Sequence, residues 1–214
     1  MKYSVIFVLI LSVIIFSGKA CCAEEDADRI VGEVEKTLKK LKTIVCSFEQ
    51  IYYRKIDDRT IKRTGTLWLK DPHLLRFEDA TKTVVVDGVT VWMYIPRNNQ
   101  VQISTFIQGE EGFPTPKSIF ERYSKSRKAE HIGREEVNGD MCDVLLLVSS
   151  DQVEQPVEVW IDSKLHFPVK TLEESRVGDT VQFVSYDIEL NNAIADEVFS
   201  FSIPEGVETV DLRE

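Results

Sequence analysis

The sequence has few of the residues that build metal-dependent or nucleophilic chemistry. Only four cysteines and three histidines occur in 214 residues, and they form neither a C-x-x-C nor an H-E-x-x-H pattern. A G-x-S-x-G motif and a glycine-rich phosphate loop are also missing. His73, His131 and His166 stand at turns or in a polar stretch, so we interpret them as solvated surface residues. We therefore expect no catalytic residue, no metal ligand set and no cofactor.

Long apolar runs are scarce as well. The one such run, Val5 to Phe16, is about 12 residues long, against roughly 20 for a membrane-spanning helix. It follows Lys2 and precedes small residues and an acidic stretch, an order typical of a secretory signal peptide. We expect residues 1–23 to be a signal peptide and residues 24–214 to form one domain. Lipidation of Cys21 or Cys22 stays open as an alternative, and a permanent N-terminal anchor is less favoured.

Positive charge is in deficit. The chain has 26 basic and 36 acidic residues, a formal charge of −10, and removal of Lys2 and Lys19 with the leader would make it −12. Such a surface repels phosphate backbones and anionic lipid headgroups. Nucleic acid is therefore excluded as an expected partner.

Cleavage after Ala23 would leave only two cysteines, Cys46 and Cys142. Export to an oxidising compartment permits a disulfide between them. The alternative is a pair of buried thiols that behave as small apolar groups. The sequence leaves both possibilities open, since nothing in it brings the two cysteines together.

Helical periodicity is limited to two segments. Ile30, Val34, Leu38 and Leu41 recur at helical spacing, which predicts an amphipathic helix over residues 26–43. Residues 108–125 contain two glycines and two prolines before a helical pattern, which indicates a loop leading into one or two short helices.

Most of the remaining chain alternates with a period of two. Asp87-Gly88 and Asn138-Gly139 are strong hairpin signals between such stretches. We count about eleven short strands, and include 198–203 as a short tail. Because helices do not alternate with strands, a parallel α/β fold is excluded. The pattern predicts an antiparallel sheet that curls into a barrel or half-barrel.

Several strands are apolar on both faces. Val91 and Met93 face opposite to Trp92 and Tyr94, so both sides of this strand need cover. Either the two helical segments supply that cover, or the sheet contains a partly unfilled apolar cavity that awaits a ligand. The pattern alone does not decide between them.

Four stretches resemble the LolA family of lipoprotein carriers. They match its SF-x-Q, G-x-L-W-[VL]-K-x-P-x-x-[LF]-R-[FW], V-x-DG-x-x-[LV]-W-x-Y-x-P and F-x-F-x-x-P-x-G-V patterns, in that order. The matching residues are 45–50 (VCSFEQ), 65–77 (GTLWLKDPHLLRF), 84–96 (VVVDGVTVWMYIP) and 199–207 (FSFSIPEGV).

The resemblance implies a mainly β fold, an unclosed antiparallel β-barrel with a helical lid over an apolar cavity. It further implies a monomeric periplasmic carrier that takes lipoprotein acyl chains from an inner-membrane release complex to an outer-membrane acceptor lipoprotein. A LolA-like lipid or lipoprotein sensor, or a membrane-attached acceptor, is the alternative. We expect cavity-lining residues among Leu67, Leu69, Leu75, Trp92 and Tyr94.

One departure from the family concerns the lid. Its members carry an arginine that helps to hold the lid shut, at the position where this chain has Asp71. A carboxylate cannot donate those hydrogen bonds at neutral pH. The lid region is expected around Asp71, Ile119 and Phe120, and the sequence leaves open how the lid closes without the arginine.

Overall fold

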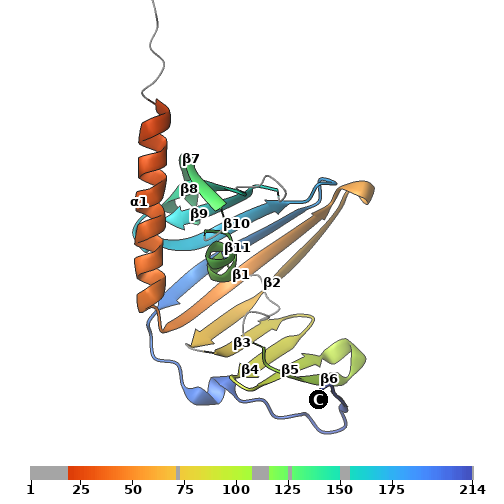
Figure 1. Ribbon diagram of the computed structural model, residues 1–214. Helices are drawn as coiled ribbons and strands as arrows, with labels where there is room; N and C mark the ends of the chain where they lie inside the picture. Colours follow the sequence, from red (N-terminus) through yellow and green to blue (C-terminus); the bar gives the residue numbers. More distant parts are fainter. Residues whose placement is uncertain (1–18, 71–72, 108–115, 125–126, 150–154, 214) are drawn as a thin grey trace, which may run out of the picture.

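A strongly curled sheet dominates the structure (Figure 1). The computed structural model describes residues 19–70, 73–107, 116–124, 127–149 and 155–213. The described helices are α1 (Lys19–Lys40), α2 (Pro116–Ser124) and the 3-10 turns η1 (Lys55–Asp57), η2 (Pro96–Asn98) and η3 (Asp196–Phe199). The strands are β1 (Thr43–Arg54), β2 (Arg59–Lys70), β3 (Leu74–Asp79), β4 (Thr83–Asp87), β5 (Thr90–Ile95), β6 (Gln100–Thr105), β7 (Arg127–Val137), β8 (Asp140–Ser149), β9 (Val157–Asp162), β10 (Phe167–Glu174), β11 (Thr180–Leu190) and β12 (Glu208–Asp211).

All twelve described strands form one sheet in the order β12-β6-β5-β4-β3-β2-β1-β11-β10-β9-β8-β7. Every neighbouring pair is antiparallel except β12 with β6, which is parallel. The ends of this order, β12 and β7, do not pair with each other, so the barrel is unclosed. The predicted fold class is confirmed, with β12 as a strand that the sequence pattern did not indicate.

The predicted hairpin turns are present. Gly88 and Gly139 have φ of 93° and 91°, and Asn138 has φ of 52°, values that favour glycine and asparagine. The Asp87 carboxylate accepts hydrogen bonds from the backbone N–H groups of Val89 and Thr90, at 2.9 and 2.7 Å. Local turn chemistry therefore sets the register of these two hairpins.

Helix α1 begins earlier and ends earlier than predicted, at Lys19 and Lys40 rather than at 26 and 43. Its apolar stripe, which includes Ile30 and Val34, is buried in the main core, and it contacts β7 and β10. Lys39 and Lys40 occupy the last turn, where positive charge complements the helix dipole. None of the described helices is long and apolar enough to cross a bilayer.

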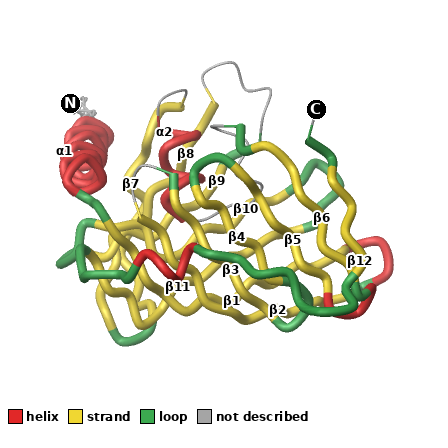
Figure 2. Tube along the Cα trace, turned by 90° about the horizontal axis from the view of Figure 1, so that it is seen from below, coloured by secondary structure: helices red, strands yellow, loops and turns green. Residues whose placement is uncertain are grey.

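Helix α2 lies inside the curl of the sheet, whereas α1 runs beside the β7 end (Figures 1 and 2). Phe120 of α2 is fully buried in the same core as the inner side chains of β1 to β4. We call the surface of the sheet that faces this core the inner face. The opposite surface is the outer face.

The outer face of β3 to β6 is covered by the C-terminal strap, residues 191–212. The short tail expected at 198–203 is part of this strap, which has η3 followed by extended chain and ends in β12. Arg76 donates to the Val198 carbonyl at 3.1 Å, and Lys70 pairs with Asp196. At the other end, Asn99 donates to the Gly206 carbonyl at 2.8 Å.

Candidate acyl-binding site

The register places apolar side chains in rows across the inner face. One row runs through Leu67, Phe77, Val84 and Met93, and the adjacent row runs through Leu69, Leu75, Val86 and Val91. All eight belong to the main core or pack against it. This apolar surface is continuous over four strands, β2 to β5.

The five residues predicted to line a cavity do not share one face. Leu67, Leu69 and Leu75 are on the inner face. Trp92 and Tyr94 are on the outer face, where each ring lies 6.4 Å from that of Phe201 in the strap. Alternation along β5 shows that these two residues share a face, but it cannot show which face is concave.

An aromatic row bounds the apolar surface on one side. The Phe48 ring stacks on Phe77 at a centroid distance of 4.8 Å and on Phe183 at 5.1 Å. Gly65 lies directly opposite Phe48 on β2. A Cβ atom at Gly65 would lie 2.7 Å from the Phe48 ring and 2.0 Å from the Glu78 carbonyl oxygen. Glycine at this point therefore lets the ring lie across β2 and reach Phe77 on β3.

The lid residues are only partly described. Phe120 contributes a fully buried side chain from α2, and α2 contacts β7, β9, β10 and β11. Ile119 is in α2, but its side chain is outside the described set, and Asp71 lies outside the described residues.

Beyond the aromatic row the inner face opens into a groove of about 230 Å³. Alternation and register bring its lining together from β1, β2 and β11. The lining residues are Gln50, Tyr52, Ile61, Arg63 and Val181. Sequence reasoning missed this groove, because it depends on which strands become neighbours.

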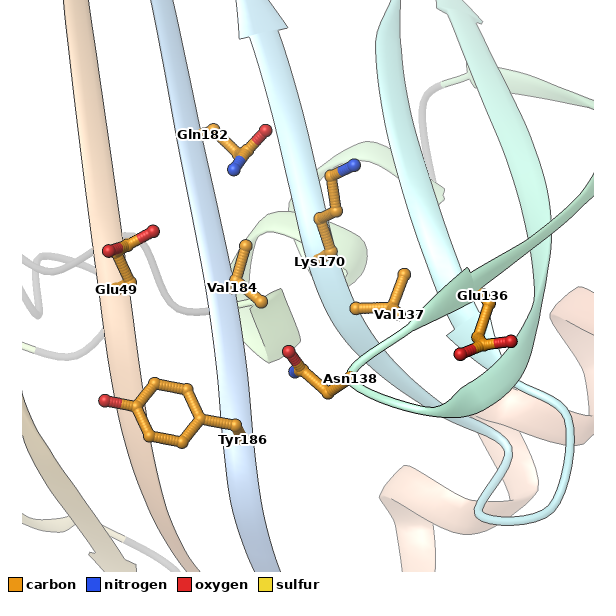
Figure 3. Close-up of a pocket in the computed structure, with 8 residues that line it drawn as sticks. All are labelled: Glu49, Glu136, Val137, Asn138, Lys170, Gln182, Val184 and Tyr186. Atoms are coloured by element: carbon orange, nitrogen blue, oxygen red, sulfur yellow. The ribbon is translucent and has the colours of Figure 1, made fainter.

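A second depression, of about 490 Å³, lies on the outer face (Figure 3). The Nζ atom of Lys170 lies 3.7 Å from the ring centroid of Trp160, and Asn138 donates to the Ser185 carbonyl at 3.2 Å. Charged and amide side chains make this surface unsuited to acyl chains. It is lined by Glu49, Glu136, Val137, Asn138, Lys170, Gln182, Val184 and Tyr186.

Cys46 and Cys142 are two buried free thiols, so the structure has the second of the two alternatives and not a disulfide. Burial raises the pKa of each thiol to about 11. Thiols with so high a pKa carry almost no thiolate at neutral pH and make poor nucleophiles.

One polar cluster resembles a catalytic arrangement. Asp143 accepts from Arg134 Nε at 2.7 Å and from Ser163 Oγ at 3.0 Å, and His131 Nε2 lies 3.3 Å from its carboxylate. Burial raises the pKa of Asp143, but these hydrogen bonds outweigh that effect and lower it. Serine and histidine both contact the carboxylate, which differs from a catalytic triad, where the histidine lies between the serine and the aspartate.

The cluster corrects the interpretation of His131 as a solvated residue, since only 19% of its side chain is exposed. No group of three or more potential metal ligands occurs in the part of the chain that the structure describes.

Comparison with known proteins places the fold in a family. The sequence profile of LolA, the outer membrane lipoprotein carrier protein, matches residues 39–202. The chain belongs to the LolA family. The four sequence patterns and the unclosed sheet with α2 in its curl agree with this membership.

Individual relatives are distant in sequence. The outer-membrane lipoprotein carrier protein of Pasteurella multocida is 25% identical, over 86% of this chain and 87% of its own length. An uncharacterized protein of Methanocaldococcus jannaschii is 24% identical over 96% of this chain, which spans only 59% of that protein. A crystal structure of an uncharacterized conserved protein from Thermus thermophilus shares the fold, with a TM-score of 0.57, 15% identity and coverage of 87% of this chain and 99% of that one.

Proposed function

We propose that this protein is a periplasmic carrier that shields lipoprotein acyl chains against its inner face. The observation that supports the proposal is the apolar surface of β2 to β5, which includes Leu67, Leu69 and Leu75 and belongs to the same core as Phe120 of α2. When α2 separates from β7, β9, β10 and β11, Phe120 leaves the shared core and a bound acyl chain takes its place.

The energetic need for shielding is large. Each acyl CH₂ group left in water costs about 0.8 kcal/mol, so a chain of 15 such groups costs about 12 kcal/mol. An apolar surface that is covered by a lid in the empty carrier and by the acyl chain in the loaded carrier can offset most of this free energy. No nucleotide is needed. The carrier receives its cargo from an inner-membrane release complex, acts as a monomer and delivers to an outer-membrane acceptor lipoprotein. The predicted leader of residues 1–23 directs it to the periplasm.

Site-specific photo-crosslinking tests the proposal. A photoreactive phenylalanine analogue at Met93 would face the inner surface, and the same residue at Trp92 would face the strap, although the two positions are adjacent. We expect a purified triacylated lipoprotein to crosslink at position 93 and not at position 92. Equal crosslinking at both positions, or crosslinking at position 92 alone, would contradict acyl binding on the inner face.

A further inference from the structure

The groove beyond the aromatic row differs in chemistry from the apolar surface that it adjoins. Arg63 and Phe183 lie on either side of Gln50 in the register, and Ile61 and Val181 lie on either side of Tyr52. Along β1 and β2, away from the core, the inner face therefore presents aromatic rings first. A guanidinium and an amide follow, and then a second short apolar row. A ligand that follows the face from the core must be apolar first and polar next.

The adjacent β3–β4 turn adds an unsatisfied acceptor. Asp79 Oδ1 accepts from the N–H groups of Thr81 and Lys82, at 2.6 and 2.9 Å. Its Oδ2 is buried and has no hydrogen-bond partner within the described residues. A buried carboxylate oxygen without a donor is costly, and a ligand N–H or O–H would relieve that cost.

Positive charge converges on the same place. The Lys82 ammonium lies 5.5 Å from the Phe77 ring centroid. Burial lowers the pKa of Lys82, Asp79 opposes that effect, and the positive charge of Arg63 adds to the lowering. The charges of Lys82 and Arg63 therefore influence each other, and the register places Asp79 opposite Gly65, two residues from Arg63 on the same face of β2.

We propose that this groove binds the polar junction of an acylated peptide, where acyl chains join the polypeptide through ester and amide groups. Arg63 and Gln50 donate to the carbonyl oxygens of the junction, and Asp79 Oδ2 accepts from an amide N–H. The first side chains of the peptide then lie over Ile61 and Val181. This inference rests on the proposed binding of acyl chains to the inner face.

A mixed set of donors and one acceptor fits an amide-containing junction better than a phospholipid phosphate. Amide groups present C=O and N–H together, which matches Arg63, Gln50 and Asp79. A phosphate offers acceptors only, and its negative charge would lie beside the Asp79 carboxylate, where like charges repel. The relative affinity of the protein for these two ligand classes therefore tests the proposal directly.

The experiment uses the whole mature protein and two soluble short-chain ligands with the same acyl groups, a diacylglyceryl-cysteinyl peptide and a phosphatidic acid. Arg63→Glu and Asp79→Asn are the test variants. Lys62→Glu is the matched control, because it makes the same charge change one residue away on the outer face, where Lys62 lies 3.8 Å from Glu49. Thermal unfolding checks that each variant is folded, and isothermal calorimetry measures Kd.

We expect the wild-type protein to bind the lipopeptide more tightly than the phosphatidic acid. Arg63→Glu should raise the lipopeptide Kd about tenfold, the effect of losing one charge-assisted hydrogen bond. Asp79→Asn should also weaken lipopeptide binding, since it replaces the free acceptor by a donor while Oδ1 keeps the turn. Lys62→Glu should leave Kd within about twofold of the wild type, as exposed charges contribute little.

Two results would overturn the inference while leaving the proposed function intact. One is wild-type binding of the lipopeptide that neither Arg63→Glu nor Asp79→Asn weakens more than Lys62→Glu does. The other is tighter binding of phosphatidic acid, strengthened by Asp79→Asn, which would assign the groove to a phosphate headgroup. Failure of the wild-type protein to bind the lipopeptide at all would refute the proposed function and this inference together.

Discussion

Gly65 provides the most direct test of the packing on the inner face. Gly65→Ala places a methyl group 2.0 Å from the Glu78 carbonyl oxygen and 2.7 Å from the Phe48 ring. Both are far inside van der Waals contact, and the first neighbour is backbone, which cannot rotate away. Overpacking of this kind costs about 3 kcal/mol, near the upper end of the usual range. For a chain of this size the melting temperature should fall by about 6–12 °C.

The matched control is the same substitution at Gly32, in the middle of α1. A Cβ atom there meets nothing within 4 Å, so Gly32→Ala removes only backbone freedom from the unfolded chain. We expect it to stabilise the protein by about 0.5–1 kcal/mol. The same glycine-to-alanine substitution should therefore lower the free energy of unfolding at position 65 and raise it at position 32.

Urea unfolding of the two alanine variants and the wild type measures both effects. A second variant, Phe48→Leu combined with Gly65→Ala, removes the ring contact but leaves the clash with the Glu78 carbonyl. It should therefore recover little stability. If the free energy of unfolding of Gly65→Ala is within about 0.5 kcal/mol of the wild type, the close approach of the Glu78 carbonyl and of Phe48 to Gly65 is wrong.

Three further outcomes follow from the buried and clamped groups. Replacing Lys70 or Arg76 by methionine should speed amide hydrogen exchange in the C-terminal strap and leave exchange in the β1–β2 ladder unchanged, as read by mass spectrometry; equal exchange in the strap would show that these contacts do not hold it. The thiols of Cys46 and Cys142 should resist iodoacetamide at neutral pH in the folded protein and react fully in urea, because burial raises each pKa to about 11. Leu75→Glu should destabilise the fold by about 3 kcal/mol or more, since Leu75 is only 4% exposed, and a normal melting temperature would instead show that its surroundings admit water.

The elements set by local chemistry were predictable from the sequence. Asp87-Gly88 and Asn138-Gly139 form their hairpins because the turn residues themselves adopt positive φ or cap the turn. The apolar stripe of α1 was predictable for the same reason, since the helical repeat places Ile30 and Val34 on one side. Such signals depend on residues only a few positions apart.

Features set by distant pairing were not predictable. Alternation along β5 separates Met93 from Trp92, but only the curl of the whole sheet makes one side concave. The strap is held by single contacts, such as that of Arg76 with the Val198 carbonyl. Contacts of this kind leave no helical or strand-like repeat in the sequence. The groove depends on β11 lying beside β1, and these strands are far apart in sequence.

The unpaired ends of the sheet order have a mechanical consequence. No ladder joins β12 to β7, so no backbone hydrogen bond between these two strands holds the curl at a fixed width. Such freedom carries the risk of polymerisation through exposed edges. Here β6 is shielded by β12, a strand of only four residues bearing Glu208 and Asp211, and the β7 end is flanked by α1. The sheet therefore stays open between its two end strands, while both of its edges are covered by other parts of the same chain.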